Sequence, residues 1–398
     1  MSAHAKSRPL DGITVLSLEH AIAAPFCTRQ LADLGARVIK IERPGTGDFA
    51  RAYDERVRGM ASHFVWTNRS KESLTLDLKA PRAAEILDRL IERADVLVQN
   101  LAPGAAARLG LSYEAVSQRN PRIVVCDISG YGDDGPYREK KAYDLLIQAE
   151  GGFLSVTGSP DAPAKAGNSI ADIAAGMYAL QSVMAGLIQR DRTGRGARYD
   201  ISMLECMAEW MGYPLLYAFE GAEPPPRAGA SHATIYPYGP FPTGDGRTVM
   251  LGLQNEREWA LFCTRVLERP DLIADPRFSA NARRSAARTE LAAIIEEVFA
   301  GLDRAAVMAR LDAAGIANAG VNSMADLWAH PQLHARGQFG AVDSPVGPLP
   351  TLLPPGRTEA YAPRLDPVPA LGEHSAAILA ELGYDGAAID ALRADGVI

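Results

Sequence analysis

Short apolar runs alternate with helical stretches over the first half of the chain, and this alternation limits the possible folds more than any other feature. The runs have the length and the Val, Ile and Leu content of buried strands, and they span residues 13–18, 38–42, 74–78, 96–100 and 123–128. Helices are predicted over residues 25–34 and 81–93, the second with one apolar stripe made of Ala84, Leu87, Leu90 and Ile91. Repetition of strand, helix and strand predicts a parallel sheet with helices on both faces. The expected fold class is α/β, with a Rossmann-like parallel-sheet large domain.

A second, smaller domain is predicted where the pattern changes, near residues 221–227. Three consecutive prolines, 224 to 226, are typical of an extended linker. Beyond them we expect a strand pair around a Gly244-Asp245-Gly246 turn, and helices over residues 259–267, 290–300 and 304–314. Two helices, over 375–382 and 387–394, close the chain. The predicted division is a large domain of residues 1–220, completed by 335–398, and a small α+β domain of residues 221–334.

Composition and local patterns exclude several classes of function. The net charge of −7 comes from 48 acidic and 41 basic residues without a basic block, which disfavours nucleic-acid binding. After the first predicted strand the chain reads His20-Ala21-Ile22-Ala23-Ala24-Pro25, without the glycines of a dinucleotide fingerprint. No apolar signal segment follows Lys6 and Arg8, and the apolar run 177–188 is too short to span a bilayer, so a cytoplasmic protein without a membrane partner is expected. The four cysteines lack a C-x-x-C pair, which predicts buried thiols and no metal site.

Asp172 stands out because it follows a glycine-rich approach and opens a long amphipathic run over 173–189. Unpaired N–H groups and the helix dipole favour an anion there, so we expect an ionised carboxylate that could act as a nucleophile. The commoner role of such a residue is to cap the helix, and Asn168 and Ser169 lie nearby. This segment alone leaves both roles open.

Motifs spread over nearly the whole chain carry a family resemblance. They are Ile41-Glu42-Arg43-Pro44-Gly45, Asn68-Arg69-Ser70-Lys71, Asn100-Leu101-Ala102-Pro103-Gly104, Thr193-Gly194-Arg195-Gly196, Asp275-Pro276-Arg277-Phe278 and the ending from Leu371 to Ile398. In this order and spacing they resemble class III CoA-transferases, the CaiB/BaiF family, from about Leu10 to the last residue. The resemblance implies two domains, an interlocked homodimer in which each chain threads through a ring of the other, CoA thioesters as substrates and no permanently bound cofactor.

The resemblance places the catalytic aspartate of the family on Asp172. A carboxylate can attack a thioester to give a mixed anhydride and CoA thiolate, and then an aspartyl-CoA thioester, without a metal or a histidine base. Backbone N–H groups of Gly151, Gly152 and the start of the Asp172 helix are our candidates for stabilising the oxyanions.

The resemblance also implies a CoA site with cationic and apolar parts. Cations are needed for the phosphates, although an exposed Arg or Lys is more often only solvated. The predicted cations are Arg43, Lys79, Arg108 and Lys141. The residues predicted near adenine are Leu76, Asn100 and Leu101, those near pantetheine are Ala21 and Ile22, and Tyr143 and Asp144 complete the set.

The acid that receives CoA is predicted from the second domain. Formyl-CoA transferases carry consecutive glycines where this chain reads Ser231-His232-Ala233-Thr234-Ile235-Tyr236-Pro237-Tyr238-Gly239, which makes oxalate an unexpected acceptor. The segment resembles members that use succinyl-CoA and a dicarboxylic acid such as glutarate, malate, citramalate, itaconate or mesaconate. The residues considered as partners of the second carboxylate are His20, Arg51, Arg227, His232 and Tyr236, and a structural role stays open for each.

Two other functions remain as alternatives. An α-methylacyl-CoA racemase also keeps the aspartate but needs a histidine before a second aspartate, and here that pair is Tyr143-Asp144. Because a tyrosine has a pKa near 10, it is a poor base at neutral pH, and the racemase is disfavoured. A non-catalytic CoA-binding protein is the second alternative, and the presence of Asp172 together with Arg43 and Lys141 argues against it.

Overall fold

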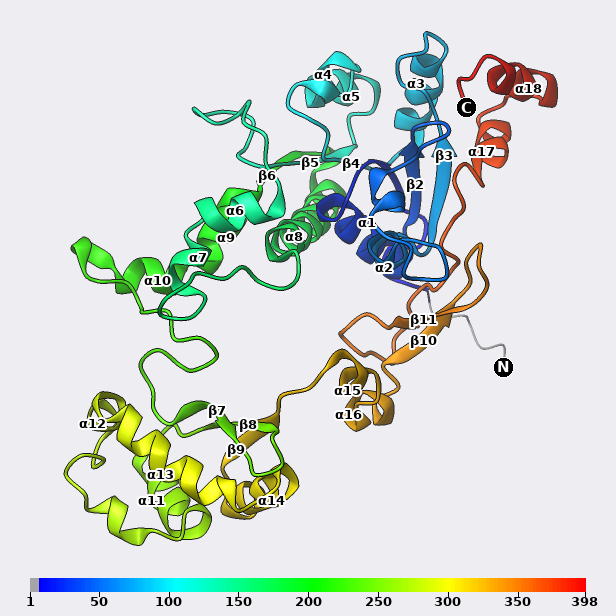
Figure 1. Ribbon diagram of the computed structural model, residues 1–398. Helices are drawn as coiled ribbons and strands as arrows, with labels where there is room; N and C mark the ends of the chain where they lie inside the picture. Colours follow the sequence, from blue (N-terminus) through cyan, green and yellow to red (C-terminus); the bar gives the residue numbers. More distant parts are fainter. Residues whose placement is uncertain (1–6) are drawn as a thin grey trace. The chain divides into compact units, whose positions relative to one another are not determined.

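A six-stranded parallel sheet forms the centre of the large unit. The computed structural model describes residues 7–398. The strands are β1 (Thr14–Leu18), β2 (Arg37–Glu42), β3 (Lys71–Thr75), β4 (Val96–Gln99), β5 (Val124–Ser129) and β6 (Arg198–Ser202). Their order in space is β3-β2-β1-β4-β5-β6, and every neighbouring pair is parallel (Figure 1). This confirms the predicted α/β class with a Rossmann-like sheet. The order reverses between β1 and β4, which is where open α/β sheets bind ligands.

Two strands differ from the prediction. β3 covers Lys71–Thr75, whereas residues 74–78 were predicted, because Lys71 and Ser73 are polar side chains that are buried inside the protein. β6 was not predicted at all. Its first three residues are exposed or half-buried, and Arg198 and Asp200 are charged, so the run lacks the Val, Ile and Leu content by which the other strands were found.

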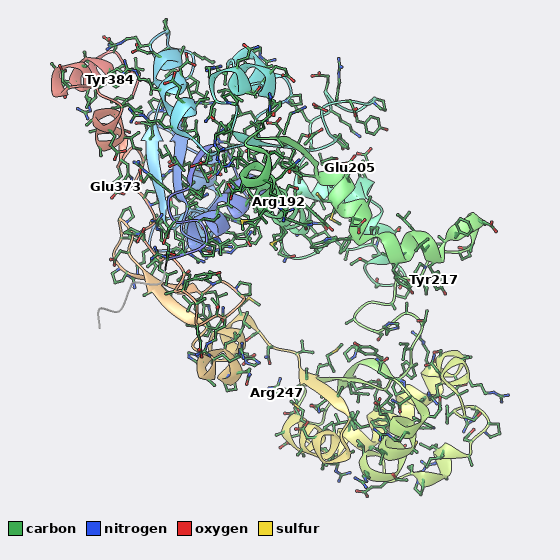
Figure 2. The ribbon with its side chains drawn as sticks, turned by 180° about the vertical axis from the view of Figure 1, so that it is seen from behind. Arg192, Glu205, Tyr217, Arg247, Glu373 and Tyr384 are labelled. Carbon is green, nitrogen blue, oxygen red and sulfur yellow. The ribbon has the colours of Figure 1, made fainter. Side chains whose placement is uncertain are left out.

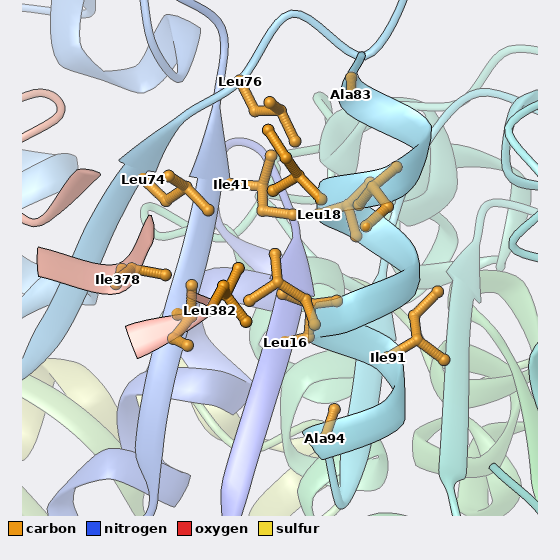
Figure 3. Close-up of a cluster of buried hydrophobic side chains, with 14 of the residues drawn as sticks. Leu16, Leu18, Ile41, Leu74, Leu76, Ala83, Ile91, Ala94, Ile378 and Leu382 are labelled. Atoms are coloured by element: carbon orange, nitrogen blue, oxygen red, sulfur yellow. The ribbon is translucent and has the colours of Figure 1, made fainter. Parts of the chain in front are cut away.

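Helices cover both faces of the sheet. α1 (Ala23–Asp33) and α8 (Ile170–Thr193) pack together on one face. On the other face, a core joins the sheet to α3 (Ala83–Arg93), α5 (Tyr113–Arg119), α17 (Ser375–Glu381) and α18 (Gly386–Ala394). Figure 3 shows Leu16, Leu18 and Ile41 of the sheet beside α3, and Ile91 of α3 belongs to the same core. The predicted stripe on α3 is wrong at one position, because Ala84 is exposed and Ala83 is buried instead.

The close approach of α8 to its neighbours depends on small residues. A Cβ atom at Gly176 would lie 2.7 Å from the Ala23 carbonyl oxygen, and one at Gly186 would lie 2.8 Å from Val124. The helix is 24 residues long, and by length and composition alone it could cross a membrane, so the prediction that its apolar run is too short is wrong. A buried core helix passes the same test, and α8 buries Ala174, Ala175 and Val183. Its length is therefore weak evidence for a membrane.

The remaining elements of the large unit are short. They are a 3₁₀ turn, η1 (Phe49–Ala52), α2 (Ser62–Asn68), α4 (Ala105–Arg108), α6 (Asp144–Glu150), α9 (Met203–Trp210) and the antiparallel pair β10 (Phe339–Val342) and β11 (Leu349–Leu352). The described chain divides into this unit, made of residues up to 151, 166–211 and 332–398, and a small unit made of 152–165 and 212–331. The small unit begins at 212 and ends at 331, where 221 and 334 were predicted, and it also includes residues 152–165, which were predicted to belong to the large domain.

The small unit has an antiparallel sheet of β7 (Tyr238–Pro242), β8 (Thr248–Gly252) and β9 (Ala317–Gly320). The predicted strand pair around the Gly244-Asp245-Gly246 turn is confirmed as β7 and β8, whereas β9 was not predicted. The helices are α7 (Phe153–Val156), α10 (Gly212–Tyr217), α11 (Glu256–Leu261), α12 (Asn281–Ala286), α13 (Arg288–Ala300), α14 (Arg304–Ala314) and α15 (Met324–Trp328), while α16 (Pro331–Ala335) begins at the boundary. The linker around the three prolines has neither helix nor strand, as predicted. Over the whole chain the four cysteines are buried and free, which confirms the predicted thiols.

Candidate active site

Hydrogen bonds join the segments that follow β1 and β4, at the point where the strand order reverses. His20, which follows β1, donates its backbone N–H to the Asn100 side-chain oxygen at 2.9 Å, and the Asn100 amide donates back to the His20 carbonyl at 2.9 Å. Both residues were predicted from sequence as part of the site. The paired bonds fix the position of the loop that follows β1.

A cavity of about 410 Å³ opens beside this point, at the carboxyl ends of β1, β2 and β3. Six of the residues predicted from sequence line it, namely His20, Arg43, Leu76, Lys79, Leu101 and Arg108. They come from the four segments of the chain that follow β1, β2, β3 and β4, and the strand order brings them together. The structure therefore brings five of the eleven predicted CoA-binding residues to one cavity, together with His20, which was predicted as a partner of the acid.

The charges around the cavity favour an anionic ligand. Arg43, Lys79 and Arg108 are exposed. Two of the three carboxylates at its wall are already neutralised, Glu19 by Lys71 at 2.6 Å and Glu42 by Arg51 at 2.8 Å. Within residues 7–398 the side chains of these three cations form no ion pair, and they lie at a wall that also includes the apolar Leu76 and Leu101. This arrangement suits phosphate groups beside a flat ring.

A group of fully buried charges supports the loop after β1. The ammonium of Lys40 lies 2.8 Å from Asp48 and 3.3 Å from Glu19, and all three side chains are inaccessible to solvent. The other Asp48 oxygen accepts hydrogen bonds from Ala21 N at 3.2 Å and Ala50 N at 2.9 Å. Ala21 has φ of +61°, a conformation that is strained for a residue with a Cβ atom. Asp48 therefore holds the strained loop to the turn that carries Phe49, whose ring stacks on His20.

Asp172 lies in the first turn of α8 and is half-buried. Burial, and secondly the negative charge of Asp144, raise the pKa of its carboxyl to about 7. This corrects the expectation that the helix start keeps Asp172 ionised. No residue in the described part of the chain donates a hydrogen bond to this carboxylate, so Asp172 does not cap its helix.

Asp144 does the capping instead. One of its oxygens accepts from Ala171 N at 2.8 Å and from Asp172 N at 3.3 Å. The N–H group of Gly151 donates to the Ile147 carbonyl at 2.8 Å. Because these donors are occupied, neither Gly151 nor the start of α8 is available as the predicted oxyanion donor.

Tyr53 belongs to the surroundings of Asp172 and was missed by the sequence analysis. Burial raises the pKa of its phenol to about 12, and the charges of Asp48, Asp172 and Tyr143 add to the effect. The phenol therefore stays neutral and shares the electrostatic environment of the aspartate. Its only sequence signal was its position two residues after Arg51, which by itself indicates nothing.

The other predicted residues of the large unit fall outside the cavity wall. Both Nε and Nη2 of Arg51 donate to Glu42 at 2.8 Å, which favours a structural role over contact with a substrate. Lys141 and Tyr143 are exposed on the segment that leads into α6. Ala21 and Ile22 form the loop between β1 and α1.

The predicted acid-binding residues of the small unit are engaged locally. His232 accepts hydrogen bonds at Nδ1 from Thr234 N and Ile235 N, and its ring stacks on Tyr238. Tyr236 lies in the core of the unit, where burial raises its pKa to about 12. Arg227 donates to the carbonyl groups of residues 159 and 160, so its charge is not directed toward a ligand. Gly152 begins α7 with a positive φ of 77°.

Within residues 7–398 no group of three or more His, Cys, Asp or Glu side chains is placed to hold a metal ion. The residues described above provide a half-buried carboxylate, Asp172, and a cavity with three cations at the carboxyl ends of the strands.

The chain resembles known proteins over almost its full length. The model of CoA-transferase family III matches residues 10–375. A succinyl-CoA:glutarate CoA-transferase of Mus musculus is 35% identical, with 98% of this chain and 90% of the relative aligned. An acetyl-CoA:oxalate CoA-transferase of Acetobacter aceti is 34% identical over 86% of this chain and 88% of the relative. The crystal structure of a CaiB/BaiF family protein from Brucella suis superposes with a TM-score of 0.85 at 35% identity, covering 94% of this chain and all of that one.

Proposed function

Because the chain belongs to CoA-transferase family III, we propose that it moves CoA from succinyl-CoA to a small dicarboxylic acid, with Asp172 as the nucleophile. The cavity beside the β1 and β4 ends is the observation that carries this proposal. It gathers Arg43, Lys79 and Arg108 around an apolar floor, which are the charges and the surface that a nucleotide with a 3′-phosphate and a diphosphate requires.

The reaction that suits a lone carboxylate is a double displacement. The Asp172 carboxylate attacks the thioester carbonyl carbon, the C–S bond breaks, and CoA leaves as thiolate with the electron pair, which gives a mixed anhydride. The thiolate then attacks the Asp172 acyl carbon and expels the donor acid as its carboxylate, which leaves an aspartyl-CoA thioester. The carboxylate of the acceptor repeats both steps in reverse, so the thioester energy is kept and Asp172 is regenerated.

The acyl donor and the acceptor follow from the resemblance and from the comparisons. Relatives named for succinyl-CoA and glutarate align with 94–98% of this chain at 33–35% identity, and 231–239 lacks consecutive glycines. Identity alone does not separate glutarate from oxalate, because oxalate enzymes reach 32–34%. The segment 231–239 is therefore the reason to place glutarate and the related C4 and C5 dicarboxylates first.

The test is an assay of the purified protein with succinyl-CoA and one acid at a time, read by mass spectrometry. The acids are glutarate, itaconate, mesaconate, citramalate, malate, oxalate and carnitine. We expect a new CoA ester of a dicarboxylate together with free succinate, and a loss of turnover of about a thousandfold or more in Asp172→Asn, since removal of a nucleophile costs several orders of magnitude. Transfer only to oxalate would overturn the acceptor class. Deuterium uptake by a 2-methylacyl-CoA without any transfer would favour the racemase alternative.

We also propose that the protein works as a homodimer. α10 exposes Tyr213, Leu215, Leu216 and Tyr217, with exposed fractions of 60%, 62%, 75% and 44% (Figure 2, Tyr217). A row of large apolar side chains on one short helix is typical of a surface that a partner covers. Light scattering should give a mass of twice 42.6 kDa, and Leu215→Glu with Leu216→Glu should lower it. A monomeric wild-type protein at micromolar concentration would contradict the proposal.

A further inference from the structure

The start of α8 is capped by a residue from another helix. Asp144 is the first residue of α6, and its Oδ1 accepts from the backbone N–H groups of Ala171 and Asp172. Its second oxygen accepts from the Gln148 side chain at 2.7 Å, which fixes the carboxylate within its own helix. The side chain of Ser169, the residue before α8, makes no capping bond.

The remaining donors of the first turn are also satisfied. Ile170 N donates to the Asn168 carbonyl at 2.9 Å, and Ile173 N donates to the Ser169 carbonyl at 3.0 Å. An acidic side chain at the third position of a helix often accepts a hydrogen bond from the N-terminal N–H groups, and Asp172 holds this position after the N-cap Ser169. Because Asp144 and the two carbonyls occupy every one of these four N–H groups, the Asp172 carboxylate is left without a hydrogen bond from the described residues. A carboxylate that accepts no hydrogen bond keeps its electron density for attack.

We propose that Asp144 is a positioning residue: it caps α8 in place of Asp172, so that the nucleophile is held by its backbone while its carboxylate stays free and is made more nucleophilic by the neighbouring negative charge. This rests on the proposed function of Asp172. It also gives Asp144 a different role from the CoA-binding one that the resemblance implied.

The electrostatics agree with this role. Burial is the largest cause of the raised pKa of Asp172, and the negative charge of Asp144 is the second. The other polar groups nearby, Tyr53 and Tyr143, are phenols, and Tyr53 stays neutral because its pKa is about 12. Other charged side chains on the elements packed against α8 are not among the causes of this pKa shift. Arg29 and Asp33 of α1 pair with each other, and Arg198 of β6 pairs with Asp127 of β5. Glu205 and Glu209 lie on α9.

The test compares Asp144→Asn, which keeps an acceptor oxygen but removes the charge, with Asp144→Ala, which removes both. For Asp144→Asn we expect the acidic limb of the kcat/KM profile to move to lower pH by about half a unit or more, because a like charge has been removed. The plateau kcat should fall severalfold, and KM for succinyl-CoA should change less than about twofold. For Asp144→Ala we expect a loss of kcat of about tenfold or more.

Arg43→Ala is the matched control from the cavity, and it should raise KM for succinyl-CoA without moving the pH limb. If Asp144→Asn behaves like Arg43→Ala, Asp144 is a CoA ligand and the inference is overturned. Unchanged kinetics in both Asp144 variants would overturn it as well. Titration of the Asp172 carboxyl by ¹³C NMR in aspartate-labelled protein does not depend on turnover, so it tests the inference even if the wild-type protein transfers no CoA. A shift of that titration to lower pH in Asp144→Asn supports the inference, and an unshifted titration contradicts it.

Discussion

At the scale of single residues, the folded state and the proposed reaction favour different protonation states of the Asp172 carboxyl. Burial and the charge of Asp144 disfavour its ionised form, although the proposed attack on a thioester requires that form. A carboxylate held in this way is a better nucleophile than a solvated one, and its cost is a loss of stability. Functional residues often carry such a cost.

The cost can be measured. The pKa of Asp172 is about 7 in the folded protein and near its usual value in the unfolded chain. Between about pH 4 and 7 the unfolded chain releases the proton while the folded protein keeps it, so this group lowers stability as the pH rises, and the full loss is reached above pH 7. The free energy of unfolding of Asp172→Asn should therefore be about 2–4 kcal/mol higher than that of the wild type at pH 8, with no such gain at pH 4. Denaturant titrations at both pH values measure this, and equal differences at both would contradict it.

At the scale of elements, a buried group of charges ties β1, β2 and β3 to the site. Lys40 of β2 and Lys71 of β3 share the carboxylate of Glu19, which follows β1, and Lys40 also binds Asp48. Burial lowers the pKa of Lys71 to about 8, against the opposing charge of Glu19. Removing one partner of such a group leaves a buried charge uncompensated.

For this reason Lys40→Met should destabilise the protein by about 3–5 kcal/mol. The control is Arg82→Met, because Arg82 forms an exposed pair with Asp395 at 3.0 Å. Such a surface pair contributes about 1 kcal/mol or less. Equilibrium unfolding in urea measures both variants. Equal losses in the two would show that the buried charges do not support the fold as described.

The elements also show what the sequence could reveal. β1, β2, β4 and β5 were predictable because each is a short run rich in Val, Ile and Leu, in which polar residues such as Ser17, Lys40 and Asp127 stand singly. β6 and the true start of β3 were not, since Arg198 and Lys71 look like surface residues until their partners, Asp127 and Glu19, are known. The capping of α8 by Asp144 was equally invisible, because 28 residues separate Asp144 from Asp172.

At the scale of the whole molecule, the strand order converts scattered motifs into a site. His20, Arg43, Lys79 and Arg108 lie in four separate connections, and the β3-β2-β1-β4 order places all of them at one cavity. The family resemblance implied Arg43, Lys79 and Arg108, whereas His20 was considered only as a partner of the second carboxylate. It could not reveal that Arg51 is bound to Glu42 or that Tyr236 is part of a core, because those roles depend on which neighbours the fold supplies.

The most direct test of the central claim is to look for CoA on Asp172 itself. The protein is mixed with succinyl-CoA in the absence of an acceptor, quenched in acid, digested and analysed by mass spectrometry. We predict a CoA thioester on the peptide that contains Asp172, lost when glutarate is added before quenching and absent in Asp172→Asn. Turnover without this adduct, or an adduct on another residue, would contradict the account.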